Sequence, residues 1–393
     1  PCGVRPDRSP RDRRIEPMEP ANPLKIYIIA GEASGDLHGK NLLKGFQAMR
    51  PGIVFRGVGG DGLQSQGMIL VRHIRETSFM GFTQVLANLG KIGRLFRDVK
   101  ADVLDFRPDA VVLIDYPGFN LRIAKWFKAQ GIKVFFYISP SVWAWKKSRI
   151  HQIKARVDRL FAILPFEKPF YAAEGYEVDY LGHPLLDEIE GREFHRDDTR
   201  RSLIDPDGRL VVMMPGSRMQ EIKRMLPKMM AIKNRFPKSR FLVAGAPAIP
   251  HEFYSGIIGS VDIPVLYGHT YDLLAAADAA LVTSGTATLE TALFKVPQVV
   301  CYASNALSVW IARRLVKVRF ISLVNLILDR EVVRELIQEQ LHPEALAAEL
   351  RRLLDDPNRK AQIDTGYAEM REKLGEPGAS GRVAAKILAL TGR

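Results

Sequence analysis

Short apolar runs alternate with helical patterns along almost the whole chain. The runs are rich in Val and Ile and do not alternate with polar residues, which is typical of strands covered on both faces. Strands of this kind, separated by helices, form parallel sheets with crossover connections. The predicted strands are 26–30, 53–58, 110–114, 133–138, 159–164, 178–181, 210–214, 240–244, 263–266, 279–282 and 297–301.

This series of strands is too long for one ordinary sheet. A polar stretch near 184–208 interrupts it, and 393 residues of which 47% are hydrophobic suit roughly two or three domains. The sequence therefore predicts an α/β protein with two Rossmann-like, doubly wound domains that face a cleft. The expected segments are a disordered, Pro- and Arg-rich N-terminal extension (1–23), a first domain (24–190), and a second domain (191–393) whose C-terminal helices, 343–355 and 380–391, pack back across the cleft.

The formal net charge of +13 belongs mainly to the folded body of the chain. A basic body favours phosphorylated substrates, anionic lipid surfaces or nucleic acid, and charge alone does not choose among them. The chain has only two cysteines, Cys2 and Cys301, which argues against a disulfide framework and suits a reducing cytoplasm. No apolar run approaches the ~20 residues that a membrane-spanning helix needs.

The first predicted unit, Ile26–Gly39, reads IYIIAGEASGDLHG and joins a buried strand to a helix through a glycine turn. Ligands of open α/β sheets bind outside the carboxyl ends of the strands. Four polar side chains crowd this strand end: Glu32, Ser34, Asp36 and His38. We expect them to contact a ligand or an acceptor; the alternative is a plain capped turn.

A second unit, Met214–Arg218, closes a strand and opens a helix in the second half. Free backbone N–H groups at the start of a helix, together with Ser217 and Arg218, would make an anion site. The alternative interpretation is a Ser N-cap beside a solvated Arg.

A third unit, Ser284-Gly285-Thr286, also lies between a strand and a helix. The start of that helix would favour a diphosphate through its dipole and its unpaired N–H groups. Glu290 is four residues beyond Thr286 on the same helix face, where a carboxylate could accept both hydroxyls of a ribose. The alternative is a Thr cap with Glu290 facing the core, which is costly for an unpaired carboxylate.

In the first half, Asp115 follows the buried strand 110–114 and precedes a Pro-Gly turn. A partly desolvated Asp at this position could have a raised pKa and act as a general base, or it could cap the helix that starts near Asn120. Trp143 and Trp145 share one loop and suggest a sugar, lipid or interface contact, or burial under the loop. His183 could touch a phosphate or close a turn.

Residues 80–99 form a basic amphipathic segment. Such a segment can lie on an anionic membrane, although a core helix with a solvated face is the commoner explanation. The predicted membrane contacts are Val85, Leu86, Leu89 and Ile92.

The chain contains no G-x-x-x-x-G-K-[ST] P-loop, no H-E-x-x-H and no paired C-x-x-C, and the motifs call for neither a metal nor a cofactor.

At the residues singled out above, and at several other stretches in the same order, the chain resembles lipid-A-disaccharide synthase, a bacterial glycosyltransferase of the two-domain GT-B type (family 19). One departure is Val324, where the family usually has Pro before the Asn. The matching stretches are AGEASGDLHG (30–39), MGFTQVL (80–86), IDYPGFN (114–120), YISPSVWAWKKSRI (137–150), LPFEKPFY (164–171), LGHPL (181–185), PGSR (215–218), SGTATLE (284–290) and RLVKVRFISLVNLIL (314–328).

The resemblance implies a hexosyltransferase of lipid A and lipopolysaccharide biosynthesis in Gram-negative bacteria. Such an enzyme joins UDP-2,3-diacylglucosamine to 2,3-diacylglucosamine 1-phosphate, giving a β-1,6-linked disaccharide 1-phosphate and UDP by an inverting, metal-independent displacement. It further implies that Asp115 is the base, that Glu32 and Asn325 are active-site residues, and that the second domain binds UDP. Ser34, Asp36 and His38 would then face the acceptor. A cytoplasmic enzyme held peripherally on the anionic inner membrane, and a homodimer formed through the C-terminal segments, are also implied.

Two other classes of function compete with this reading. One is a different GT-B chemistry, such as a UDP-N-acetylglucosamine transferase acting on another lipid or a UDP-sugar 2-epimerase. The other is a nonenzymatic lipid- or nucleic-acid-binding protein. We expect no nucleic-acid partner, because the chain lacks a basic-aromatic platform for single strands and has two nucleotide-type loops.

Overall fold

A computed structural model of the chain describes residues 23–77, 89–144, 147–190, 192–204, 207–304 and 318–392. The predicted N-terminal extension lies outside these ranges except for its last residue. Val85, Leu86 and Trp145 also lie outside them, as does the side chain of Leu89.

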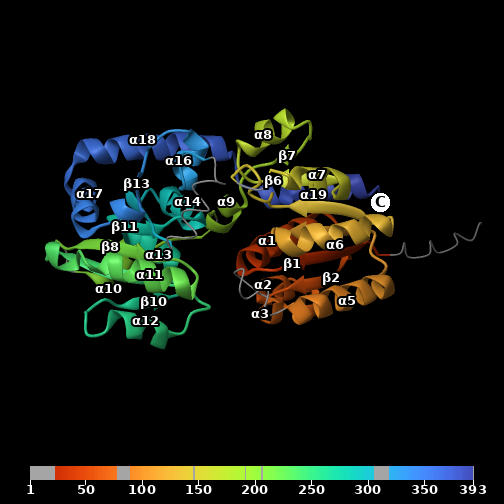
Figure 1. Cartoon of the computed structure of the whole chain (residues 1–393), viewed down its shortest axis with the longest axis horizontal. Helices are drawn as coiled ribbons and strands as arrows, with labels where there is room; N and C mark the ends of the chain where they lie inside the picture. Colours follow the sequence, from red (N-terminus) through yellow and green to blue (C-terminus); the bar gives the residue numbers. More distant parts are fainter. Residues whose placement is uncertain are drawn as a thin grey trace, which may run out of the picture.

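The first half of the chain forms a seven-stranded parallel sheet with the order β3-β2-β1-β4-β5-β6-β7 (Figure 1). Its strands are β1 (Lys25–Ala30), β2 (Val54–Gly59), β3 (Ile69–His73), β4 (Ala110–Ile114), β5 (Lys133–Tyr137), β6 (Arg159–Ala162) and β7 (Asp179–Tyr180). The helices of this half are α1 (Ala33–Met49), α2 (Asp61–Ser65), α3 (Ile74–Thr77), α5 (Leu89–Phe106), α6 (Pro117–Ala129), α7 (Arg149–Arg156), α8 (Glu167–Ala173) and α9 (Pro184–Ile189).

The second half forms a six-stranded parallel sheet with the order β10-β9-β8-β11-β12-β13. Its strands are β8 (Arg209–Met214), β9 (Ser239–Gly245), β10 (Val265–Tyr267), β11 (Ala279–Thr283), β12 (Gln298–Tyr302) and β13 (Arg334–Ile337). The helices are α10 (Arg196–Leu203), α11 (Met219–Met230), α12 (His251–Ile258), α13 (Thr270–Ala276), α14 (Thr286–Leu293), α16 (Leu323–Leu328), α17 (Pro343–Asp355), α18 (Pro357–Leu374) and α19 (Ala379–Thr391), with short 3₁₀ turns at Lys233–Arg235 and Gln338–Gln340.

Both sheets are covered on both faces. In β1, Tyr27 and Ile29 belong to one core cluster while Ile26 and Ile28 belong to another, so successive side chains enter apolar layers on opposite sides of the sheet. The same division separates alternate residues of β8. This arrangement explains why the strand sequences are continuously apolar, and it confirms the prediction of two doubly wound α/β domains.

Every predicted strand is present, but two edge strands are absent from the prediction. In β3 the sequence ILVRH has no fully buried residue, and in β13 the short sequence RELI mixes charged and apolar residues. Edge strands bury less surface than central ones, so their sequences lack the continuous apolar run that marks the central strands.

The last helix, α19, returns to the first half of the molecule. Its residues Val383, Ala384 and Ile387 join the core cluster that covers β1, and Figure 1 shows α19 among the elements of that half. The carboxylate of Asp187 in α9 accepts hydrogen bonds from the backbone N–H groups of Gly378, Ala379 and Ser380 (2.6–3.1 Å). The prediction that 380–391 packs back is therefore correct, whereas α17 stays with the second sheet. The domain limits at 190 and 191 remain a prediction.

The described part of the basic amphipathic segment belongs to α5. Leu95 and Val99 are buried in the core cluster that also contains Tyr27 and Ile29 of β1, and Ile92 packs against the same cluster. Lys91, Arg94 and Arg97 are exposed. The apolar face of α5 is thus used inside the fold at these positions. None of the described helices is both long and apolar enough to cross a bilayer.

Candidate active site

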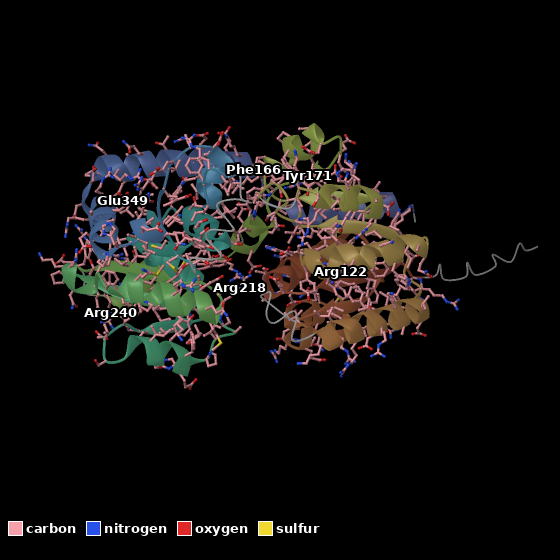
Figure 2. The ribbon with its side chains drawn as sticks, in the orientation of Figure 1. Arg122, Phe166, Tyr171, Arg218, Arg240 and Glu349 are labelled. Atoms are coloured by element: carbon pink, nitrogen blue, oxygen red, sulfur yellow. The ribbon has the colours of Figure 1, made fainter. Side chains whose placement is uncertain are left out.

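The carboxyl ends of β1 and β4 lie side by side, because Ala30 pairs with Ile114 in the sheet. Glu32 follows the first strand and Asp115 follows the second, so the two predicted carboxylates come together. Arg218, which follows β8 in the other domain, is near enough for its charge to act on Glu32. Figure 2 shows Arg218 on the side of the second domain that faces the first. The fold therefore gathers three predicted site residues from both domains.

The carboxyl group of Glu32 has a pKa of about 7 instead of 4.5. Burial is the main cause, since it penalises the charged form, and the negative charge of Asp115 raises the pKa further. The guanidinium of Arg218 acts in the opposite direction. Near neutral pH, Glu32 is therefore a group that can hold or release a proton, which is typical of functional sites.

Asp115 sits on an unusual backbone. Its φ is +46° and that of Tyr116 is +48°, the left-handed region that non-glycine residues seldom occupy. Its N–H donates to the carbonyl of Tyr137 (3.0 Å) and its own carbonyl accepts the side-chain amide of Asn120 (2.7 Å). The surrounding fold thus holds the turn in a costly conformation, as is common where a side chain must be aimed.

Burial raises the pKa of the Asp115 carboxyl, and a hydrogen bond from the N–H of Tyr116 partly offsets the rise. The helix α6 begins at Pro117 with Tyr116 at its N-cap position, and Asn120 ties the turn. The alternative role of Asp115 as the cap of this helix is not supported by these contacts. Asp115 is therefore a buried carboxyl group at a strand end with a raised pKa, which is compatible with a general base.

Sequence reasoning did not select Tyr116, although it lies in the same stretch as Asp115. A Cβ on Gly31 would lie only 2.3 Å from the Tyr116 ring, so the glycine allows the ring to pack against the loop after β1. The pKa of the Tyr116 hydroxyl is raised by burial and by the charge of Glu32. Tyr116 therefore forms a wall of the site, and the signal for it was the glycine in the neighbouring loop.

The three predicted acceptor-side residues in α1 have different positions. Ser34 is exposed in the first turn. Asp36 is buried and accepts the backbone N–H groups of Gly60, Gly62 and Leu63 (2.6–3.1 Å), which fixes the loop after β2 and the start of α2. Asp36 therefore has a structural role, because its carboxylate oxygens already accept hydrogen bonds from the backbone. The acceptor assignment of Asp36 is corrected accordingly.

His38 is buried, with its pKa lowered to about 4 because burial penalises the charged ring. Its Nδ1 has no hydrogen-bond partner among the described residues. The pKa of the His183 ring is lowered to about 3, mainly by burial and further by the nearby His38. His183 Nδ1 accepts the N–H of Leu185 (3.1 Å) and so caps α9. Both histidines are neutral interior groups between α1 and α9, so His38 does not face an open acceptor surface and His183 closes a turn.

The predicted anion loop of the second domain is an exposed strand-to-helix connection. Ser217 and Arg218 follow β8 and precede α11. The carboxylate of Glu221 accepts the N–H of Ser217 (3.2 Å) and the guanidinium of Arg218 (3.1 Å). Gly216, with φ +116°, leaves room for this carboxylate, since a Cβ there would be 2.7 Å from it. The loop thus carries donors that bind an anionic group of the protein itself.

The second predicted nucleotide loop presents open backbone at the start of α14. Gly285 has φ +149°, and a Cβ there would meet nothing within 4 Å. Gly285 and Thr286 are exposed. The first N–H groups of a helix have no partner inside it, so this end can accept a diphosphate. Ser284 is less available, because its hydroxyl donates to the carbonyl of Ile321 (2.7 Å).

Glu290 lies one turn below this loop on α14. One carboxylate oxygen accepts the hydroxyl of Tyr271 (3.1 Å), and burial raises the pKa of the carboxyl. Within the described part of the chain, no hydrogen bond to the other oxygen is recorded. The position agrees with the predicted ribose contact, and Tyr271 orients the group. Tyr271 was missed because it comes from α13, and nothing in its local sequence marks it.

Asn325 occupies a closed position. Its side-chain oxygen accepts the N–H groups of Val332 and Val333, and its amide donates to Val333 and Glu335 (2.8–3.0 Å). The residue is fully buried. A direct contact between Asn325 and the donor is therefore corrected to a supporting role for the segment that precedes β13.

Trp143 is a half-buried side chain that packs against other residues of the protein. Its ring meets Phe166 edge-on with centroids 4.9 Å apart, and its Nε1 donates to Glu167 (3.3 Å). Figure 2 labels Phe166 and Tyr171 on the same side of the first domain. Of the two interpretations of this loop, the structure favours burial for Trp143.

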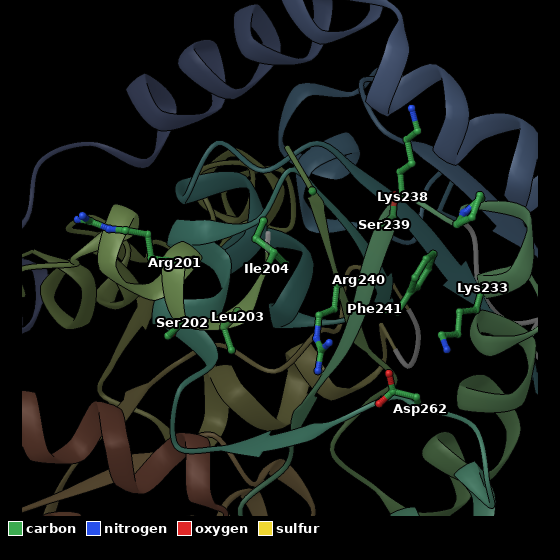
Figure 3. A pocket seen from close by; sticks show the side chains of 12 residues that line it. Arg201, Ser202, Leu203, Ile204, Lys233, Lys238, Ser239, Arg240, Phe241 and Asp262 are labelled. Carbon is green, nitrogen blue, oxygen red and sulfur yellow. The ribbon is translucent and has the colours of Figure 1, made fainter. Parts of the chain in front are cut away.

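A polar pocket lies at the opposite edge of the second sheet, where β8 and β9 begin (Figure 3). Its lining includes Arg201, Lys233, Lys238, Arg240 and Asp262. It is remote from the strand ends that carry Arg218 and Glu290, and none of the predicted site residues lines it. Within the described ranges, no group of three or more His, Cys, Asp or Glu side chains is arranged to hold a metal ion; a metal-free site stays a prediction.

Comparison with known proteins gives consistent results. A protein of the bacterium Syntrophus aciditrophicus described as lipid-A-disaccharide synthase is 42% identical over 374 residues, which cover 93% of this chain and 97% of the relative. Two solved structures share the fold at low identity. One is a kitacinnamycin glycotransferase (TM-score 0.63, 15% identity, 93% of this chain and 99% of that one). The other is a UDP-GlcNAc 2-epimerase from Neisseria meningitidis (TM-score 0.65, 12% identity, 93% and 100%).

The fold is therefore of the GT-B type, which serves glycosyltransferases and epimerases alike, and the distinction between them comes from the sequence. The family profile described as lipid-A-disaccharide synthetase matches residues 26–387, nearly the whole of both domains, so the chain belongs to the lipid-A-disaccharide synthase family.

Proposed function

We propose how the residues of this site perform the reaction of the family, the formation of the lipid A disaccharide. The donor is UDP-2,3-diacylglucosamine, held by the second domain (191–393), and the acceptor is 2,3-diacylglucosamine 1-phosphate, held by the first (24–190). The observation that carries this proposal is the electrostatic contact of Glu32 with Asp115 in its own domain and with Arg218 in the other. It supports a single reaction centre that combines a proton acceptor from one domain with a diphosphate-binding cation from the other.

Asp115 is the general base in this proposal. The 6-hydroxyl oxygen of the acceptor attacks the anomeric carbon of the donor sugar, the bond from that carbon to the diphosphate breaks, and the hydroxyl proton passes to Asp115. The neighbouring Glu32, whose pKa is raised by burial and by the charge of Asp115, is the group that holds a proton while Asp115 acts as the base. A positioned base of this kind contributes roughly 10²–10⁴-fold to the rate.

The departing UDP carries the developing charge. Arg218, the N–H of Ser217 and the start of α14 at Gly285 and Thr286 offer donors for it. Glu221 holds Arg218 and the Ser217 N–H in the structure, so the diphosphate would take over donors that this carboxylate now occupies. Glu290 accepts the ribose hydroxyls. No metal or cofactor is assigned a step.

Contact with the membrane is also part of the proposal. Both substrates carry acyl chains, the net charge is +13, and the basic residues Lys91, Arg94 and Arg97 of α5 are exposed. We place the protein on the cytoplasmic face of an anionic inner membrane through residues 80–89; Ile92, also predicted as a membrane contact, packs against the core instead. Replacing Val85, Leu86 and Leu89 with Ser should reduce flotation with anionic vesicles without unfolding the protein. Unfolding of this variant would instead indicate that these side chains pack in the core. Pairing of two copies through the C-terminal segments is tested by light scattering.

The decisive experiment supplies both acylated sugars and follows UDP release and disaccharide phosphate together. Transfer should require both sugars, and Asp115→Asn should lose it while UDP binding persists. Incubation with the donor alone is the control, because an epimerase would change the sugar without an acceptor. Wild-type turnover in Asp115→Asn would remove Asp115 as the base.

A further inference from the structure

Glu335 is a buried carboxylate that the reaction scheme does not use. It lies in β13 with 9% of its surface exposed. One oxygen accepts the N–H of Ile321 (2.9 Å), and the other accepts the N–H of Ser322 (2.9 Å), the hydroxyl of Ser322 (2.7 Å) and the amide of Asn325 (2.8 Å). Four hydrogen bonds therefore converge on one carboxylate, and within the described residues it forms no ion pair. Bonds to a charged acceptor are stronger than neutral ones.

These bonds fix a peptide unit that reaches the donor loop. The N–H of Ser322 and the carbonyl of Ile321 belong to the same peptide plane and point in opposite directions. Glu335 binds the N–H side, and the carbonyl on the other side accepts the hydroxyl of Ser284 (2.7 Å). A peptide that donates to a charged group becomes a better acceptor at its carbonyl, so the two bonds reinforce each other.

A second contact connects the same segment to the loop. The N–H of Leu323 donates to the hydroxyl oxygen of Thr288 (3.2 Å), and that hydroxyl donates to the carbonyl of Gly285 (2.8 Å). Residues 321–323 therefore touch both ends of the connection between β11 and α14. At its centre, the open backbone of Gly285 is where the diphosphate is proposed to bind.

We propose that Glu335 is a positioning residue for the UDP donor. It holds the peptide between Ile321 and Ser322, and through it the loop Ser284–Thr286 in the conformation that binds the diphosphate. Asn325 acts in the same network, because its amide binds Glu335 and its oxygen fixes residues 332 and 333. The inference rests on the proposed UDP site. Preorganised donors bind charge without the cost of ordering a loop on binding.

The test is calorimetric titration of Glu335→Gln with UDP. Glutamine keeps the shape but places an NH₂ group against backbone donors, so at least one bond is lost. We expect the dissociation constant for UDP to rise about tenfold, as for the loss of one bond to a charged group. The matched control is Glu349→Gln. Glu349 is also a buried carboxylate of this domain, on α17, paired with Arg352 and Arg359 and distant from the loop (Figure 2). The Glu349→Gln substitution should lower thermal stability and leave UDP affinity unchanged.

The route through Ser284 is tested by a double-mutant cycle. If Glu335 acts through this hydroxyl, then Glu335→Gln combined with Ser284→Ala should weaken UDP binding by less than the product of the two single effects. Multiplicative effects, or a folded Glu335→Gln protein with wild-type affinity, would overturn the proposal.

A milder variant covers the case in which Glu335→Gln does not fold. Ser322→Ala removes one of the four bonds to Glu335, together with the bond from the N–H of Asn325 to the Ser322 hydroxyl (3.3 Å). Its UDP dissociation constant should rise about two- to tenfold. Unchanged affinity in this variant counts against the proposal. A wild-type chain that fails to bind UDP would contradict the proposed function and this inference with it. Wild-type binding with an unaffected Glu335→Gln protein contradicts the inference alone.

Discussion

Replacing Glu32 with Gln should make the protein more stable at alkaline pH while it impairs transfer. The pKa of Glu32 is raised from 4.5 to about 7, mainly by burial. Between these two values the unfolded chain has released the proton that the folded chain still holds. The free energy of unfolding therefore falls as the pH rises through this window, and above about 7 the full penalty of the buried charge is present.

The size of the effect follows from the shift. One pKa unit corresponds to about 1.4 kcal/mol, so ionising Glu32 should cost about 2 to 3 kcal/mol between pH 5 and pH 8. Glutamine has the same shape and carries no charge at any pH. The free energy of unfolding of Glu32→Gln minus that of the wild type should therefore increase by this amount between the two pH values.

Urea denaturation at pH 5 and pH 8, followed by circular dichroism, measures that difference. Glu193→Gln is a suitable control, because this Glu is exposed and its side chain stays in water in both states. A difference between Glu32→Gln and the wild type that does not change with pH would refute the assignment of Glu32 as a buried, partly protonated carboxyl. Active-site groups commonly trade stability for function in this way.

Other substitutions test the remaining parts of the site. Asp115→Asn should lower kcat by about 10²–10⁴-fold with UDP affinity retained, measured by UDP release; an unchanged kcat excludes it as the base. Glu290→Gln should raise the dissociation constant for UDP about tenfold in calorimetry while that for inorganic diphosphate stays constant, because only the ribose contact is lost; equal effects on both ligands would contradict the ribose assignment. Asp36→Asn should lower the free energy of unfolding by about 1 to 3 kcal/mol, since it weakens three backbone hydrogen bonds, with KM for the acceptor unchanged. Gly31→Ala should destabilise by about 1 to 3 kcal/mol, because its methyl group would lie 2.3 Å from the Tyr116 ring; a wild-type melting curve would show that the ring moves freely.

Much of the candidate site was predictable from local sequence. Glu32, Ser217, Arg218 and Thr286 follow an apolar strand and a small-residue turn, and Asp115 follows its strand directly. Within each sheet, parallel strands bring such positions to one edge. For these residues, the strand pattern and the polar residues after it are sufficient to select them as candidate ligand contacts.

The residues that sequence reasoning misassigned are polar groups that the fold buries. Asp36 and Asn325 have the residue types of ligand-binding groups, yet their oxygens are occupied by backbone N–H groups. His38 lies in the interior between α1 and α9. For His183, the structure supports the second of the two predicted roles, closing a turn. Whether a polar side chain faces a ligand or a backbone donor depends on residues distant in the chain, such as Gly60 for Asp36.

By itself, the sequence determined the α/β class, the two sheets, their central strands and the strand ends that carry the chemistry, because continuous apolar runs and glycine turns are local signals. The tertiary structure decided what depends on distant partners. It brought Arg218 to Glu32 across two domains, returned α19 to the first sheet, and joined Glu335 to the donor loop through the peptide between Ile321 and Ser322. Hydrogen bonds, desolvation and charge interactions act over a few ångströms in space, and only the folded chain sets which residues lie within that distance.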